Sequence, residues 1–141
     1  MERRMSDETI TPDNVTRDRL QGILNAAFID YSIDSDGDIV TRDRLKCVVL
    51  PLAAKSTITL RAYFGLSESA DRAELLEAVN TSNSEYMFAR AVVVNDFRSL
   101  VFQADIPLAG GISPKCLVCS LRRFCQIPHD ACRDHFAPFM D

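Results

Sequence analysis

Residues 57–64 read Thr57-Ile58-Thr59-Leu60-Arg61-Ala62-Tyr63-Phe64, a regular alternation of polar and apolar side chains. Successive side chains of a β-strand point to opposite faces of the sheet, so Ile58, Leu60, Ala62 and Phe64 lie together on one face. This alternation is typical of an antiparallel sheet that is buried on one side only. The segment therefore predicts a strand with one face in the core.

An acidic turn separates two apolar stretches ahead of this strand. Residues 33–39 read Ile-Asp-Ser-Asp-Gly-Asp-Ile, which is typical of a β-hairpin whose Gly37 supplies a positive φ. A second strand is expected from about residue 38 to residue 52. Its apolar pattern changes phase near Arg44 and Leu45, which predicts a bulge or bend there.

Two further strands are expected after residue 64, from about residue 86 to 94 and from about residue 99 to 106. Asn95 and Asp96 lie between them and tolerate the left-handed backbone of a tight turn. The inward set of the second strand is Leu100, Phe102, Ala104 and Ile106. These two segments therefore predict a second hairpin.

Three helices complete the pattern. The first is expected over residues 12–28, with Thr11 as its cap and Pro12 at its first position. The second begins near Ser69, and its inner side is formed by Leu75, Leu76 and Val79. The third is opened by Ser113 and Pro114; Leu117, Val118, Leu121, Phe124 and Cys125 form its apolar face, and Pro128 kinks or ends it.

The order of elements is therefore α-β-β-β-α-β-β-α. We expect an α+β fold in which helices pack mainly on one side of a five-stranded antiparallel sheet. Residues 1–10 carry few apolar side chains and are predicted to be a disordered tail, and residues 11–141 form a single domain.

Composition narrows the classes of function. The formal net charge is −4, with 20 acidic and 16 basic residues, which argues against binding of nucleic acid. Residues 1–10 show no apolar signal region, and no stretch approaches the roughly 18 apolar residues of a membrane span. Five cysteines, an odd number, fit a disulfide framework poorly, so we expect a cytoplasmic protein that does not associate with membranes.

The acidic turn resembles part of a calcium-binding EF-hand loop. With Gly37 at the sixth position, Asp34 and Asp36 take the third and fifth, and Asp38 the seventh. The first and twelfth positions hold Ser32 and Asp43, where the loop requires Asp and a bidentate Glu. A solvated hairpin turn is the favoured interpretation, and calcium binding is the alternative.

A group of soft metal ligands lies near the end of the sequence: Cys116, Cys119, Cys125, His129, Cys132 and His135. They are numerous enough for a zinc site. However, Cys119 and Cys125 are six residues apart on a predicted helix, so the ligand pairs point in different directions. We expect no metal and no cofactor here, and treat the cysteines as packing residues or exposed thiols.

Neither histidine belongs to a recognisable catalytic motif, and the Gly110-Gly111 pair lacks the lysine and further glycines of a phosphate-binding loop. We therefore predict no catalytic residues. Asn80 and Asn83, near the end of the second helix, are interpreted as C-capping residues, with ligand binding as the alternative.

Three features resemble the YbjN family: the turn from Asp34 to Asp38, the asparagines Asn80 and Asn83 after a Leu-Leu pair, and Gly-Gly-Ile-Ser at residues 110–113. The resemblance spans roughly residues 12–127; the set of cysteines and histidines toward the C-terminus departs from it and is not a feature of the family. Members are described as sensory transduction regulators, and their fold is similar to that of type III secretion chaperones. The resemblance brings no catalytic residues to this sequence.

The resemblance and the missing active site together predict a non-enzymatic, chaperone-like or regulatory module that binds a protein partner and works as a homodimer. The alternative is a metal-binding regulatory or redox protein that uses the C-terminal cysteines and histidines.

Overall fold

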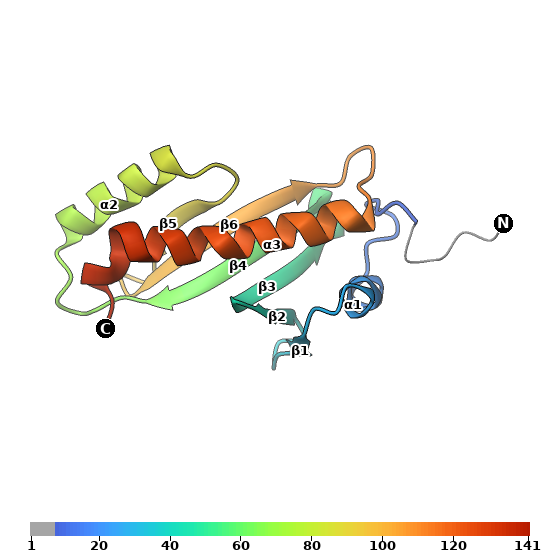
Figure 1. Ribbon diagram of the computed structural model, residues 1–141, viewed down its shortest axis with the longest axis horizontal. Helices are drawn as coiled ribbons and strands as arrows, with labels where there is room; N and C mark the ends of the chain where they lie inside the picture. Colours follow the sequence, from blue (N-terminus) through green and yellow to red (C-terminus); the bar gives the residue numbers. More distant parts are fainter. Residues whose placement is uncertain (1–7) are drawn as a thin grey trace.

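The structure is a computed structural model that describes residues 8–141 (Figure 1). Within them the chain forms α1 (Arg17–Ala26), β1 (Tyr31–Ile33), β2 (Ile39–Asp43), β3 (Leu45–Leu52), β4 (Thr57–Gly65), α2 (Arg72–Glu85), β5 (Arg90–Val94), β6 (Ser99–Pro107) and α3 (Pro114–Ala131). Short 3-10 turns lie at Ala53–Lys55 and Ala137–Phe139, and a π-helical turn at Cys132–Phe136. The fold is α+β, as predicted.

The strands form one antiparallel sheet in the order β1-β2-β3-β4-β6-β5. The prediction of five strands is wrong, because residues 38–52 form two strands instead of one. The chain reverses at Arg44, whose φ is +69°, and Asp43 lies opposite Leu45. The change of phase in the sequence therefore marks a reversal of direction, where a bulge or bend was expected.

Strand β4 lies near the centre of the sheet with the predicted face in the core. Its inward side chains pair in register with those of β6, as in Leu60 opposite Ala104 and Ala62 opposite Phe102. Ile58 and Leu60 are fully buried, and Phe64 is half-buried. Phe64 also contacts the ring of Phe102 edge-on, with ring centroids 5.8 Å apart. The alternation of residues 57–64 thus marks the core face. Thr59 on the opposite face is buried as well, and its hydroxyl donates a hydrogen bond to Asp105.

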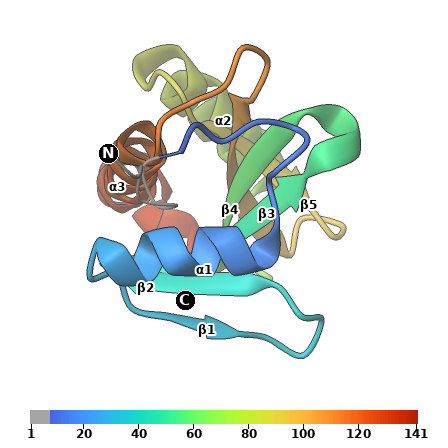
Figure 2. The same ribbon diagram turned by 90° about the vertical axis from the view of Figure 1, so that its right-hand side faces the viewer.

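The sheet curves around α1 and α3, as Figure 2 shows. Helix α3 runs along the sheet in front of β3 and β4, while α2 packs against β5 (Figure 1). The buried side chains of α3 include the predicted Leu117, Leu121, Phe124 and Cys125. Helix packing on one side of the sheet leaves the outward side chains of β3, β4, β5 and β6 on the opposite face.

Helices α1 and α2 differ from the prediction, α1 in its start and α2 in one inner residue. Helix α1 begins at Arg17, and its cap is Thr16, whose side chain accepts a hydrogen bond from the Arg19 N–H. Residues 11–14 form a separate turn in front of it, so Thr11 does not cap this helix. In α2 the predicted inner residue Leu76 is 49% exposed, while Leu75 is buried.

Helix α3 is capped by Ser113 and begins with Pro114, as predicted. Its end is different, because the helix continues through Pro128 to Ala131. Pro128 and Ala131 are both buried, as is Phe136 in the following π-helical turn. Core packing therefore keeps the chain helical where the loss of one N–H predicts a kink or an end.

The predicted disordered tail lies mostly outside the described residues, which begin at residue 8. Ile10 is fully buried, and its backbone pairs with that of Ile112 in an isolated β-bridge. This bridge ties the chain ahead of α1 to the loop in front of α3.

Candidate functional site

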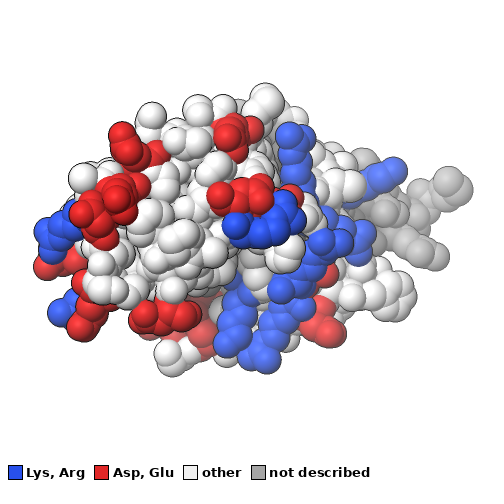
Figure 3. Space-filling model, turned by 60° about the vertical axis from the view of Figure 1, so that its left-hand side comes forward, with Lys and Arg blue, Asp and Glu red and all other residues white. Residues whose placement is uncertain are grey.

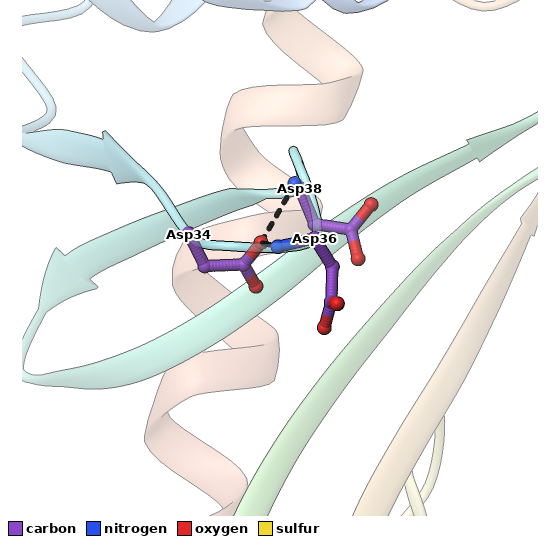
Figure 4. A group of neighbouring side chains, drawn as sticks. All are labelled: Asp34, Asp36 and Asp38. Atoms are coloured by element: carbon purple, nitrogen blue, oxygen red, sulfur yellow. Dashed lines mark hydrogen bonds between the residues drawn. The ribbon is translucent and has the colours of Figure 1, made fainter.

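The acidic turn is the predicted hairpin turn between β1 and β2. One carboxylate oxygen of Asp34 accepts hydrogen bonds from the backbone N–H groups of Asp36 and Asp38, both at 2.9 Å (Figure 4). Gly37 has a φ of +83°. The Asp34 side chain thus stabilises its own turn, as aspartates commonly do in such positions.

The three carboxylates of this turn have oxygens within 4.8 Å of one another, and no other group of metal-ligating side chains in residues 8–141 is as compact. The remaining EF-hand positions do not lie in a loop. Ser32 belongs to β1 and Asp43 to β2, where both are paired in the sheet. The twelve-residue stretch is a β-hairpin, which favours the structural interpretation of these aspartates.

The C-terminal cysteines and histidines are not gathered at one centre in the described structure. Cys116 and Cys119 are exposed on α3, whereas Cys125 is buried on the core side of the same helix. Cys132 is half-buried, and burial raises the pKa of its thiol to about 11. The Cys132 thiol therefore stays protonated at neutral pH in the metal-free chain.

Each histidine has a carboxylate partner. The Nδ1 of His129 lies 3.2 Å from a carboxylate oxygen of Asp130. The Nε2 of His135 lies 2.6 Å from a carboxylate oxygen of Glu85, which is the last residue of α2. The latter contact joins the π-helical turn to α2, so His135 has a structural explanation.

Cys47 on β3 is a residue that sequence reasoning missed. It is fully buried and interacts with Cys125 of α3 in the core. The hydrogen bond to Cys125 and the burial raise the pKa of the Cys47 thiol well above its ordinary value. Protonated, buried thiols behave as small apolar side chains, and the alternation of β3 could have placed Cys47 on the core face.

Asn83 does not cap α2, and neither does Asn80. The side-chain amide of Asn83 donates a hydrogen bond to the Ala91 carbonyl at 3.1 Å and accepts one from the Ala91 N–H at 2.7 Å. Strand β5 is at the edge of the sheet, so Asn83 satisfies backbone groups that an edge otherwise exposes. Asn80 is an exposed residue inside the helix.

The face of the sheet opposite the helices carries a polar network across β4, β5 and β6. Asp105 accepts hydrogen bonds from the Thr59 hydroxyl at 2.7 Å and from the Gln103 amide at 3.2 Å. Arg90 lies 3.4 Å from the same carboxylate, and Arg61 donates to Gln103 at 2.9 Å. The hydrogen bond from Thr59, followed by those from Gln103 and Arg90, lowers the pKa of Asp105.

Apolar side chains surround this network on the same face. Tyr63 is 54% exposed and Val92 is 39% exposed. Register places both opposite Val101, on the face away from α3. Strand β3 adds Val48 and Leu50, which lie opposite Arg61 and Thr59. We call this surface the open sheet face: Val48, Leu50, Thr59, Arg61, Tyr63, Arg90, Val92, Val101, Gln103 and Asp105.

Comparison with known proteins identifies the family. The sequence matches YbjN, described as "Putative bacterial sensory transduction regulator", over residues 16–139. The chain belongs to the YbjN family. The YbjN structure from E. coli, described as a putative transcription regulator, superposes with a TM-score of 0.71 at 13% identity, covering 83% of this chain and 88% of that chain. At this identity the superposition shows the shared fold alone.

No curated protein matches this sequence. The family is described as one of regulators, and its description names no catalytic activity. Among the helices in residues 8–141, none combines the length and the apolar character needed to cross a membrane.

Proposed function

We propose that this YbjN-family protein is a non-enzymatic regulatory module that acts by binding proteins and works as a homodimer. The open sheet face carries this proposal. It is a broad surface on which Tyr63 and Val92 present apolar area to water in the isolated chain. Surfaces of this kind mark sites of protein association.

The composition of the open sheet face suits contact with a second copy. Apolar side chains surround a centre that holds both signs of charge, with Arg61 and Arg90 beside Asp105. In a two-fold symmetric interface the same surface of both chains is used, so residue i of one chain contacts residue j of the other, and the reverse. A surface that carries both positive and negative side chains can therefore pair with a second copy of itself. Tyrosine and arginine are also enriched in the cores of such interfaces.

The chaperone-like part of the proposal rests on the expectation, from the family resemblance, that the fold is similar to that of type III secretion chaperones. The cysteines support a cytoplasmic location for the protein, since all five are free thiols and two of them are exposed.

Light scattering in dilute solution tests the homodimer. We expect the mass of two chains for the wild type and of one chain for Tyr63→Glu, because a buried carboxylate opposes association. Leu76→Glu is the matched control: Leu76 is 49% exposed, close to the 54% of Tyr63, but lies on α2. A monomeric wild type over a broad concentration range, or equal dissociation by both variants, would exclude a dimer through this face.

A further inference from the structure

A groove of about 320 Å³ lies between α1 and α3, on a different part of the surface from the open sheet face. Its lining is mainly apolar, with Ile23, Ala26 and Ala27 from α1 and Val118 from α3. Two basic residues of α3, Lys115 and Arg122, also line it, one full heptad apart. The groove thus combines an apolar floor with positive charge along one wall.

No acidic residue of the described chain is among those that line the groove. Within residues 8–141, Lys115 and Arg122 form no ion pair, although Arg122 reaches the Ala27 carbonyl at 3.5 Å. The chain as a whole is acidic, at −4. Figure 3 shows that basic and acidic side chains are unevenly distributed, with a band of Lys and Arg on one part of the surface.

Phe28 does not line the groove but is next in sequence to Ala27, which does. Phe28 lies two residues after the end of α1, has a φ of +59°, and is 94% exposed. The positive φ belongs to the cap of α1, in which the Ile29 N–H donates to the Leu24 carbonyl at 3.0 Å. The Phe28 ring itself is not buried by this cap.

Phe28 lines a smaller hollow of about 130 Å³ together with Arg42 and with two acids, Asp30 and Asp43. Arg122 lines both this hollow and the groove, so the unopposed positive charge of the groove is strongest at Lys115.

We infer that this groove binds an acidic, amphipathic helix of a partner protein, with Phe28 as an apolar contact beside the groove. This inference rests on the proposed protein-binding function and names the chemistry of the partner. An apolar floor between two helices accepts the apolar face of a third helix. Carboxylates beside that face complement Lys115 and Arg122, which steers the partner and fixes its orientation.

A nucleic acid fits this surface less well. Its phosphates would meet the two cations, but the floor of Ile23, Ala26, Ala27 and Val118 offers no hydrogen bonds to phosphate or sugar. The net charge of −4 also opposes the approach of a duplex.

The experiment is a selection of random 16-residue peptides, displayed on phage, against the wild-type protein. We expect the enriched peptides to be acidic and to repeat apolar residues at helical spacing. For a synthetic enriched peptide, fluorescence anisotropy should show that Lys115→Glu/Arg122→Glu weakens binding at least about 10-fold. The matched control, Lys55→Glu/Arg98→Glu, makes the same change of charge at exposed residues outside the groove and should leave binding unchanged.

Cys119 reports where the peptide binds. It lines the groove and is exposed, whereas Cys116 is exposed but does not line it. In the Cys116→Ser variant the peptide should slow maleimide labelling of Cys119 several-fold. In the Cys119→Ser variant it should leave the labelling of Cys116 unchanged.

The Phe28→Gly variant tests whether Phe28 contacts the peptide or only supports the fold. Glycine adopts a positive φ without strain, so this variant should unfold at a higher urea concentration than the wild type. The same variant should bind the peptide at least about 5-fold more weakly. Lower stability, or unchanged binding, would remove Phe28 from the site.

Other outcomes overturn the groove itself. Enriched peptides that bind the Lys115→Glu/Arg122→Glu variant normally would leave the protein-binding function intact and place it elsewhere. A fluorescein-labelled 16-base-pair duplex that binds the wild type and not this variant would replace the helical partner with nucleic acid. A library without binders would also exclude the groove, and the light-scattering measurement would then judge the proposed function independently.

Discussion

Asn83→Ala removes a tertiary contact without touching the core. In the wild type, the Asn83 side chain makes two hydrogen bonds to Ala91 on the edge strand β5. Alanine leaves the Ala91 N–H and carbonyl without these partners. Ala91 itself is only 2% exposed, so water replaces the lost bonds poorly.

The expected loss follows from the two bonds. Each contributes about 0.5–1.5 kcal/mol net, so their removal costs about 1–3 kcal/mol of unfolding free energy. Alanine also favours the helix over asparagine by up to about 0.7 kcal/mol, which partly hides the effect. Asn80→Ala makes the same replacement three residues earlier in α2, at an exposed position. The difference between the two variants therefore isolates the hydrogen bonds.

Urea unfolding measures this difference. We expect Asn80→Ala to match or slightly exceed the wild type, and Asn83→Ala to be about 1–3 kcal/mol less stable than Asn80→Ala. Hydrogen exchange at the Ala91 amide should accelerate in Asn83→Ala alone. Equal stability of the two variants within about 0.3 kcal/mol would refute the assignment of Asn83 to the sheet edge.

Three further measurements test the core, the open sheet face and the C-terminal thiols. Leu60→Ala should cost about 2–5 kcal/mol in urea unfolding, because Leu60 is fully buried; a loss below about 0.5 kcal/mol would contradict its place in the core. The pKa of Asp105 is lowered from its ordinary value of 3.8, so its ionised form stabilises the fold above pH 3.8, and this stabilisation is lost as the pH falls through the lowered pKa. In the Asp105→Asn variant, the free energy of unfolding should therefore depend less on pH in that window than in the wild type. A strong chelator should leave the melting curve unchanged, and elemental analysis should find no stoichiometric zinc; one zinc per chain with a large fall in melting temperature would favour the metal-binding alternative.

The parts of the fold that the sequence predicted are those whose signals are local. The hairpin at Asn95 and Asp96 follows from residues that tolerate positive φ, and both adopt it, at +55° and +53°. Ser113 and Pro114 begin α3 because a capping hydroxyl and a fixed φ act within one turn. Such features depend only on residues that are close together in the chain, so they can be predicted from a single sequence.

The parts that it missed depend on contacts between distant residues. The partner of Asn83 lies on another strand, so a capping role was the only local explanation of its residue type. Leu75 and Leu76 are both predicted on the inner side of α2, yet the packing of this helix buries Leu75 and leaves Leu76 49% exposed. The candidate metal ligands are a contrasting case. Helix geometry applied to their six-residue spacing predicts that Cys119 and Cys125 point in different directions, and in the structure Cys119 is exposed and Cys125 is buried.

Bulky residues with positive φ link these observations to function, because each requires compensation. Arg44 adopts its φ of +69° where β2 reverses into β3, and sheet pairing on both sides compensates the strain. Phe97, with a φ of +64°, packs against the core and beneath the guanidinium of Arg72, which lies 4.4 Å from its ring centroid. Phe28 has no such packing and remains 94% exposed. The backbone of Phe28 closes α1 instead: the Phe28 and Ile29 N–H groups donate to the carbonyls of Asn25 and Leu24 at 3.1 and 3.0 Å. Glycine suits this position better than a bulky residue, so Phe28→Gly should raise stability while it removes the exposed ring from the proposed binding surface.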